Sequence, residues 1–298
     1  MSTIALQEKQ KERVSILPIA FVILWSSGYI GGAFGVRYSE PFTMTFFRFT
    51  TAAIIFLAVA LYIRAPWPRS WVSYAHAAVV GLLLQVLQFG GLYAGIRGGV
   101  PAGEAALIVG MMPIFVILGA SRFLGERISW RDLPGSLLGI GGVAIVVASH
   151  LGTHSVNWAP YFYVSLALVG ITTGTIYQKK FLTGINLWVG CFIQMVVGSL
   201  VMLLLAETTE TMQVTEVLPF AAAVAWIALM NSVGALTLLY EMIRRGEASK
   251  ATNLFHVIPA TTQIMASAVL GEFPSPTAIV GFLVSGAGVY LMNNTPRK

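Results

Sequence analysis

Charged residues are scarce in this chain, since only 10% of its 298 residues are Asp, Glu, Lys or Arg. A soluble domain carries about 25%. Polar stretches are also short, and the longest plainly polar one covers residues 1–13. These shortages exclude a cytoplasmic ATPase module, a nucleic-acid-binding domain and an extracellular receptor domain. Any activity must take place inside a bilayer or at its surface.

Cysteine and nucleotide-binding motifs are nearly absent as well. The one cysteine, Cys191, lies in an apolar run, which excludes an internal disulfide and a thiolate metal cluster. The segment Gly139-Ile140-Gly141-Gly142-Val143-Ala144 fits the dinucleotide pattern, but it has no preceding strand and indicates close helix packing instead. We therefore expect no metal, no cofactor, no ATPase subunit and no enzymatic activity. The basic residues are scattered in ones and twos, which argues against a nucleic-acid partner.

Apolar residues make up 56% of the chain, and the mean hydropathy is +0.78. A membrane-spanning helix needs about 20 apolar residues. The sequence predicts an all-α integral membrane protein with ten transmembrane helices, near residues 14–34, 42–63, 70–96, 102–123, 131–149, 158–178, 185–206, 217–243, 248–270 and 275–293. The first of these lacks a cleavage signature, so we expect it to remain as a transmembrane helix.

The distribution of basic residues predicts the orientation. With a cytoplasmic N-terminus, 15 of the 18 basic residues fall in inner segments: Lys9, Lys11, Arg13, Arg64, Arg69, Arg122, Arg127, Arg131, Lys179, Lys180, Arg244, Arg245, Lys250, Arg297 and Lys298. Only Arg37 and Arg97 fall outside, and Arg48 lies within the second span. The positive-inside rule then predicts a multi-pass protein of the inner (plasma) membrane, with both termini cytoplasmic and an external 207–216 loop.

An internal repeat divides the chain into two halves. A shift of 146 residues aligns residues 102–143 with 248–289, including Pro113 with Pro259 and the Leu-Gly-Glu triplets that end at Glu126 and Glu272. Each half holds five spans, an odd number, so the second half must be inverted relative to the first. We predict a cytoplasmic segment at 1–13, a first repeat at 14–149 and a second, inverted repeat at 158–293. Such repeats are typical of secondary transporters.

The pattern Tyr93-x-x-x-Arg97-x-Gly99, followed by a small-residue helix with Pro113, Leu-Gly-Glu and a glycine-rich helix, resembles the drug/metabolite transporter superfamily. It is most similar to the ten-helix EamA-type members. Arg48 and its repeat partner Gln194 are similar to the family's residues at those positions. The resemblance covers nearly the whole chain and implies a bacterial exporter of amino acids, aromatic ones above all, or related metabolites.

Polar and aromatic residues within the spans are the candidate substrate-binding groups. Together they describe a neutral, aromatic cavity suited to a zwitterion with an apolar side chain, although each amide or hydroxyl can instead form an ordinary interhelical hydrogen bond. The candidates are Trp25, Tyr29, Gln85, Gln88, Tyr93, Tyr177, Asn231, Tyr240, Asn253 and His256. His256 lies one turn after Asn253, at the depth expected for a cavity.

Five further residues are predicted to have hinge or structural roles. Pro113 and Pro259 are expected to be hinges or static kinks. Glu126 and Glu272 are expected to cap a neighbouring helix or to lock a hairpin. Arg48 is expected to pair with backbone carbonyls or helix ends, or to extend toward the outer interface.

These observations favour a secondary exporter that works by alternating access on a small-molecule substrate, with membrane lipid as its surroundings. One alternative is a transporter of anionic substrates such as nucleotide sugars or phosphate esters, for which Arg48 and Lys179 are the available cations. Another is an intramembrane lipid-modifying enzyme, which would have to use His256 and Glu241.

Overall fold

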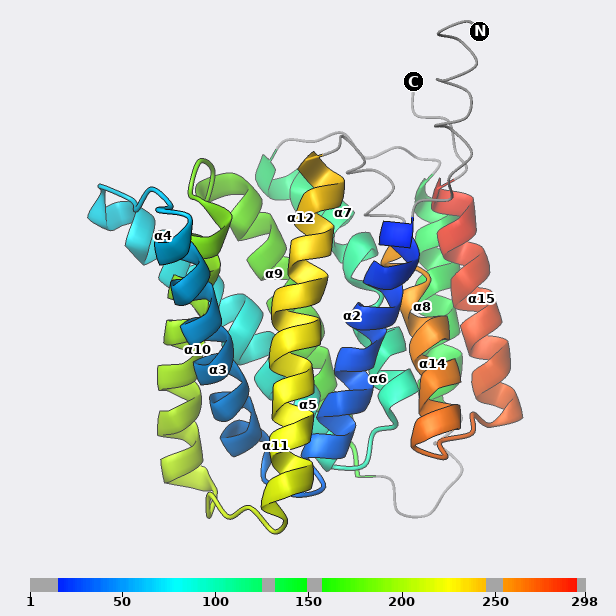
Figure 1. Cartoon of the computed structure of the whole chain (residues 1–298). Helices are drawn as coiled ribbons and strands as arrows, with labels where there is room; N and C mark the ends of the chain where they lie inside the picture. Colours follow the sequence, from blue (N-terminus) through cyan, green and yellow to red (C-terminus); the bar gives the residue numbers. More distant parts are fainter. Residues whose placement is uncertain (1–15, 125–131, 149–156, 245–253, 294–298) are drawn as a thin grey trace, which may run out of the picture.

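The computed structural model describes residues 16–124, 132–148, 157–244 and 254–293, and every regular element in these ranges is a helix (Figure 1). The elements are α2 (Ile16–Gly35), α3 (Pro41–Tyr62), α4 (Trp71–Gly81), η1 (Leu82–Gly90), α5 (Gly91–Arg97), α6 (Ala102–Val109), α7 (Met112–Leu124), α8 (Asp132–Ala148), α9 (Ala159–Phe181), α10 (Leu187–Thr209), α11 (Val217–Trp226), η2 (Ile227–Ala235), α12 (Leu236–Arg244), α14 (Ile258–Val269) and α15 (Pro276–Asn293).

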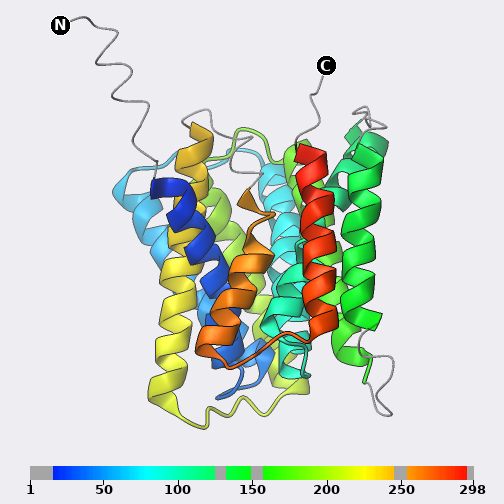
Figure 2. The same ribbon diagram turned by 90° about the vertical axis from the view of Figure 1, so that its right-hand side faces the viewer.

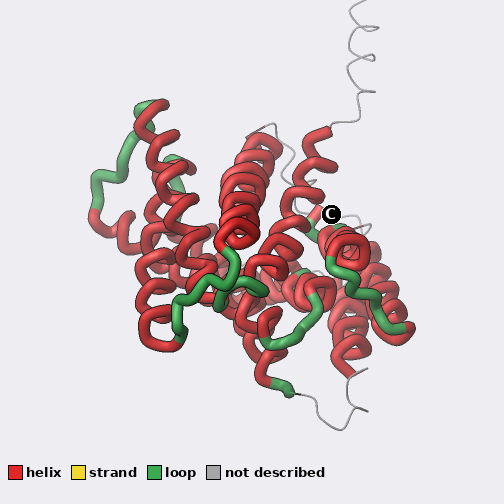
Figure 3. Tube along the Cα trace, turned by 60° about the horizontal axis from the view of Figure 1, so that its bottom comes forward, coloured by secondary structure: helices red, strands yellow, loops and turns green. Residues whose placement is uncertain are grey.

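Each of the ten predicted spans contains described helix, and seven helical runs in the described residues are long and apolar enough to cross a membrane. Shorter apolar helices include residues 134–148 and 276–288. The runs alternate in direction, so α2 begins and α15 ends at the upper face of Figure 1. The 210–216 connection lies at the lower face (Figures 1 and 2). Loops connect the helices there (Figure 3).

The backbone repeats the internal symmetry of the sequence in two places. The π-helical segments η1 and η2 occupy corresponding positions in spans 3 and 8, 145 residues apart. Span 4 is interrupted between α6 and α7 at Gly110 and Met111, and a turn at residues 255–257 precedes α14 in span 9. The sequence predicted a single span at 102–123 with a hinge or kink at Pro113, and the structure has that span as two helical pieces. The break follows from Pro113, which lacks an N–H group and fits only the first turn of the second helical piece.

Corresponding helices also pack together. Three such pairs are in contact: α3 with α10 (spans 2 and 7), α6 with α14 (spans 4 and 9), and α8 with α15 (spans 5 and 10). Glycines allow the last pair to approach closely, because a Cβ at Gly142 would meet the backbone of Gly281, and one at Gly288 would meet the backbone of Gly135. The glycine pattern of residues 139–144 therefore serves helix packing, as predicted.

At the lower face, two glutamates join the start of α3 to the end of α10. Glu210 accepts hydrogen bonds from the backbone N–H groups of Phe42 and Thr43, at 2.7 Å each. In return, Glu40 accepts one from the N–H of Thr211 at 2.6 Å. A carboxylate at a helix N-terminus satisfies donors that have no partner within the helix. This reciprocal arrangement fixes spans 2 and 7 at the lower face.

Candidate functional site

The centre of the bundle holds a buried arginine. Arg48 lies in the eighth position of α3, about 10 Å from its lower end at 1.5 Å per residue. Its side chain is 1% exposed. It therefore does not extend to the interface, which was one of the two expectations for it. Nor does it pair mainly with backbone carbonyls, because its hydrogen bonds go to side chains of other helices.

Three neutral side chains hold the guanidinium. Arg48 donates from Nη1 to the Tyr93 hydroxyl and from Nη2 to Oδ1 of Asn231, each at 2.7 Å, and from Nε to the Ser232 hydroxyl at 3.1 Å. The guanidinium carbon also lies 4.0 Å from the centre of the Phe89 ring, which is a cation–π contact. Asn231 and Ser232 belong to η2, and Phe89 belongs to η1. The arginine thus contacts both π-helical segments, a type of distortion that is frequent at functional sites.

The backbone of α2 completes this network, which we call the Arg48 network: Arg48, Tyr93, Asn231 and Ser232. The Tyr93 hydroxyl donates to the Gly28 carbonyl at 3.2 Å, and Nδ2 of Asn231 donates to the Trp25 carbonyl at 3.2 Å. Glycine is needed here for space, because a Cβ at Gly28 would overlap the Asn231 side chain.

A second polar contact is related to the first by the repeat. A shift of 146 residues relates Arg48 to Gln194, and Gln194 pairs with Gln85 of η1 as Arg48 pairs with Asn231 of η2, so the two contacts join corresponding spans. Nε2 of Gln85 is 3.5 Å from Oε1 of Gln194, which is long for a hydrogen bond. Oε1 of Gln85 is buried without a hydrogen-bond partner in the described residues. The two related contacts therefore differ, one being short and charged and the other long and neutral.

Aromatic side chains line a small cavity beside the Arg48 network. Its wall includes Trp25 and Tyr29 from α2 and Phe255, whose ring centre is 5.0 Å from that of Trp25. Pro113 and Ile258 close it at the breaks of spans 4 and 9. About 20 Å³ is open to the centre of a water-sized sphere, which is room for about one water molecule. The cavity is thus closed to a larger solute in this conformation.

The other predicted substrate-binding residues lie in several places. Gln85 and Gln88 are buried in η1 and are not among the residues that line this cavity. The Tyr177 hydroxyl is 2.8 Å from Nδ1 of His76, in an aromatic cluster with Phe181 near the upper end of α9. His256 lies in the turn before α14, and its Nδ1 is buried without a hydrogen-bond partner in the described part of the chain.

The remaining candidates are only partly covered by the structure. Tyr240 lies on α12, and its side chain is outside the described residues, as are Asn253 and Glu126. Pro259 lies in the first turn of α14, and a Cβ at Gly110 would meet its ring, so the breaks of the two repeats adjoin each other. Oε2 of Glu272 accepts a hydrogen bond from the N–H of Ala102 at 2.8 Å. This carboxylate caps α6, in the other repeat, rather than the next helix in the chain.

Sequence reasoning missed several residues of this region. Ser232 and Phe89 were not singled out as partners of Arg48, because their contacts join residues 184 positions apart or depend on the π-helical register. Glu104 was overlooked although it is a buried carboxylate in the first turn of α6, where it accepts a hydrogen bond from Tyr161 at 2.8 Å. A carboxylate inside an apolar span was a signal that could have identified it. Within the described ranges, no group of three or more His, Cys, Asp or Glu side chains could hold a metal ion.

Comparison with known proteins identifies a transporter family. Residues 13–148 and 158–294 each match the model of the EamA-like transporter family. A probable terminal-alkyne amino-acid exporter of Streptantibioticus cattleyicolor is 28% identical over 282 residues, which cover 91% of this chain and 90% of the relative. A probable amino-acid metabolite efflux pump of Escherichia coli K12 is 21% identical, with 93% of each chain covered.

Two further matches agree on the class of protein and on the fold. An uncharacterized inner membrane transporter of Escherichia coli K12 is 25% identical, with 85% of this chain and 81% of the relative covered. One solved crystal structure has a TM-score of 0.65 at 17% identity and covers 93% of this chain and 95% of its own. At that identity, the structural match establishes the fold alone.

Proposed function

The chain belongs to the EamA-like transporter family, and from that premise we propose that it exports amino acids with apolar or aromatic side chains across the inner membrane by alternating access. The family and the named relatives are transporters rather than enzymes, so the lipid-modifying alternative has no support. Two relatives are named as exporters of amino acids or their metabolites. The transported molecule is a small solute, and its identity is the subject of the proposal.

The observation that carries the proposal is the position of the aromatic cavity. It lies where the breaks of spans 4 and 9 meet α2, at the contact between the two repeats. Trp25, Tyr29 and Phe255 offer flat apolar walls, which suit a planar or branched apolar side chain. Inverted-repeat transporters bind their substrates at such a midplane position between the repeats.

The small size of the cavity favours alternating access. Room for about one water molecule is far less than an amino acid needs, so the substrate can enter only after the helices move. Pro113 and Pro259 lie directly after the breaks, where the backbone is not held by continuous helical hydrogen bonds. We propose that these breaks bend while the cavity opens to one side and then to the other.

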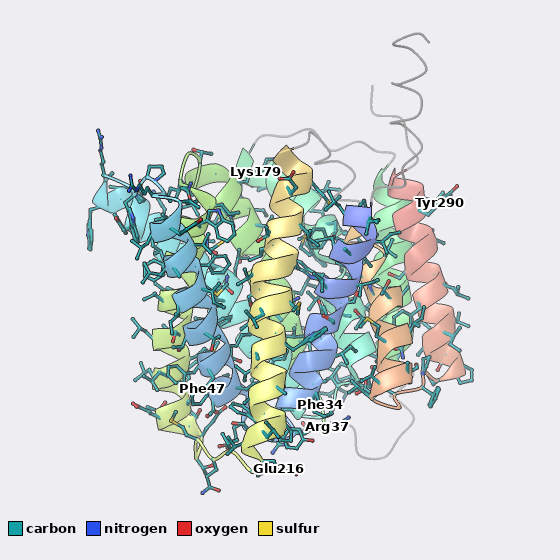
Figure 4. All side chains as sticks on the ribbon, viewed as in Figure 1. Phe34, Arg37, Phe47, Lys179, Glu216 and Tyr290 are labelled. Atoms are coloured by element: carbon teal, nitrogen blue, oxygen red, sulfur yellow. The ribbon has the colours of Figure 1, made fainter. Side chains whose placement is uncertain are left out.

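We also propose that the upper face of Figure 1 is cytoplasmic. Arg64, Arg69, Arg122, Lys179 and Lys180 lie near this face, whereas Glu40, Glu207, Glu210, Glu216 and Glu272 lie near the lower face. Figure 4 places Lys179 at the upper end of the bundle, and Arg37 and Glu216 at the lower end. The positive-inside rule then assigns the upper face to the cytoplasm. Exposed apolar side chains such as Ile54, Leu200 and Leu283 would face lipid.

A counterflow experiment tests the function. Proteoliposomes preloaded with unlabelled phenylalanine should take up labelled phenylalanine, tryptophan or leucine without ATP. Trp25→Ala removes one aromatic wall, which is worth roughly 0.5–1.5 kcal/mol, so its KM should rise about two- to tenfold. Trp71→Ala is the matched control, because Trp71 is 82% exposed at the upper face. Uptake of a phosphorylated compound, with no uptake of any amino acid, would favour the anionic-substrate alternative.

A further inference from the structure

The Arg48 guanidinium carries a charge that its protein partners do not balance. Its three hydrogen bonds in the described residues go to the hydroxyls of Tyr93 and Ser232 and to the amide of Asn231, all of which are neutral. A buried cation in a membrane protein is costly and is generally paired or functional. Arginine also has five N–H donors, so two of them are left after these three hydrogen bonds and can donate to a further partner.

The Arg48 network and the aromatic cavity both adjoin the same segment of α2. Residues 24–29 of α2 border both features. The carbonyls at Trp25 and Gly28 accept hydrogen bonds from Asn231 and Tyr93 of the Arg48 network, while the side chains of Trp25 and Tyr29 line the cavity. A carboxylate at Arg48 and an apolar side chain in the cavity would therefore both lie against this segment of α2.

The repeat supplies a second argument, because the corresponding position carries no charge. Gln194 takes the place of the arginine, and its partner Gln85 lies in η1, the counterpart of η2. Both glutamines are 5% exposed, so this second contact is as deeply buried as the first. If a buried polar contact were needed only to join spans 2 and 7 to the π-helical segments, an amide would serve in both repeats. The charge at one position alone indicates an anionic group that binds in one orientation.

We propose that Arg48 binds the carboxylate of the transported substrate, taking the place of Asn231 and Tyr93, and that the release of Asn231 leaves η2 bonded to Arg48 through Ser232 alone. This inference rests on the proposed function and names the group that recognises the substrate. A carboxylate accepts two parallel, charge-assisted hydrogen bonds from arginine, which are stronger than bonds to a neutral amide and a phenol. Substrate binding thereby favours a conformation in which η2 is held less firmly to α3.

A substrate series tests the carboxylate requirement directly. Phenylalanine, phenylalaninamide and 2-phenylethylamine share the aromatic ring and the amino group, but only phenylalanine has a carboxylate. Wild-type proteoliposomes should show counterflow of labelled phenylalanine that unlabelled phenylalanine competes with, whereas the other two compounds at equal concentration should compete at least about tenfold less well. Equal competition by 2-phenylethylamine would overturn the inference.

Substitutions at Arg48 test the residue itself. Arg48→Gln removes the charge and should raise the KM for phenylalanine more than about tenfold while leaving the weak competition by 2-phenylethylamine unchanged. Arg69→Gln is the matched control, because Arg69 is an exposed arginine at the upper face. If Arg48→Gln does not fold, Arg48→Lys keeps the charge without the planar fork and should raise the KM about tenfold. An unchanged KM in the folded variant would overturn the inference.

Asn231→Asp offers an independent readout. It places a carboxylate 2.7 Å from the guanidinium without a change of size, so it should occupy Arg48 permanently. The variant also loses the Nδ2 hydrogen bond to the Trp25 carbonyl, so the readout is the effect of the ligand: we expect no rise of its thermal midpoint when phenylalanine is added. If phenylalanine stabilises Asn231→Asp as much as the wild type, Arg48 is not the carboxylate site.

The proposed function and the Arg48 inference fail in different ways. If no amino acid shows counterflow in the wild type, the proposed function is wrong. The thermal midpoint of the wild type is then measured with a panel of aromatic and aliphatic carboxylates, and no rise with any of them overturns the Arg48 inference also. If phenylalanine is transported but neither the carboxylate nor Arg48 affects its KM, the function stands and the inference alone is wrong.

Discussion

At the scale of single residues, polar groups in this bundle fall into two classes. Those around Arg48 are paired by short hydrogen bonds. Others nearby in the fold, namely Oε1 of Gln85, Oγ1 of Thr172, Oγ1 of Thr262 and Nδ1 of His256, are buried without a partner among the described residues. Most buried polar atoms in proteins are satisfied, so unsatisfied ones call for an explanation. A cavity that opens and admits water or a solute during transport would provide their partners.

The first residue-scale prediction concerns Gly32. A Cβ at this position would overlap the ring of Tyr93, so Gly32→Ala must displace a side chain that is 0% exposed and bonded to Arg48. Overpacking of this kind costs about 1–3 kcal/mol. We expect a lower thermal midpoint in detergent and weaker transport. Gly141→Ala is the control, since nothing lies within 4 Å of its Cβ. Equal midpoints for both variants would contradict the described packing.

The second residue-scale prediction concerns Glu272 and the pH dependence of stability. Burial raises the pKa of this carboxyl above its ordinary value of 4.5, and the Ala102 N–H and Arg37 oppose the rise. Between the unfolded and folded pKa values the folded state binds more protons, so stability falls as pH rises through the window that begins near 4.5. Glu272→Gln keeps an acceptor for the Ala102 N–H but does not titrate. The thermal midpoint of this variant minus that of the wild type should therefore increase as the pH rises from 4.5.

Glu216→Gln is the control for the loss of one negative charge at the same face, since Glu216 lies at the exposed start of α11. If the midpoints of Glu272→Gln and the wild type keep a constant difference across this range, Glu272 does not titrate differently in the folded and unfolded states.

At the scale of elements, the broken spans are the parts most suited to movement. We predict that Pro113→Ala and Pro259→Ala, which allow more continuous helix, will each slow the maximal rate of counterflow several-fold while the thermal midpoint is unchanged or higher. Pro276→Ala serves as the control, because Pro276 is exposed at the first position of α15 and follows no break. Faster or unchanged counterflow in both variants would show that the breaks are static features.

The sequence predicted the helices of this fold far better than their irregularities. Long apolar windows and Pro–Leu-Gly-Glu spacing depend on residues close together in the chain, so the ten spans and the repeat could be derived from them. The π-helical register of η1 and η2 depends on packing against α9 and α2, which no local pattern specifies. The Arg48–Asn231 contact joins residues 183 positions apart. The repeat offset that relates it to Gln85–Gln194 was available in the sequence, but it does not state which residues touch.

At the scale of the whole molecule, the contacts between repeats are concentrated in two kinds of structure. Paired helices such as α8 and α15 touch backbone to backbone through glycine, so they pack closely against each other. At the lower face, Glu210 and Glu272 each cap a helix of the other repeat, α3 and α6 respectively. These caps are hydrogen bonds at the protein surface, which break and form more readily than packed backbone. The described conformation is therefore fastened at the lower face, the face we assign to the outside.

The last prediction tests that assignment. With Cys191 replaced by Ser, single cysteines are introduced at Gln213, which is exposed in the lower 210–216 connection, and at Arg69, which is exposed at the upper face. The excess of basic residues at the upper face predicts that it is cytoplasmic. A membrane-impermeant maleimide should then label Gln213→Cys in intact cells and Arg69→Cys only after permeabilisation. The reverse pattern would place the glutamate caps inside the cell, and the fastened lower face would then close the cavity toward the cytoplasm.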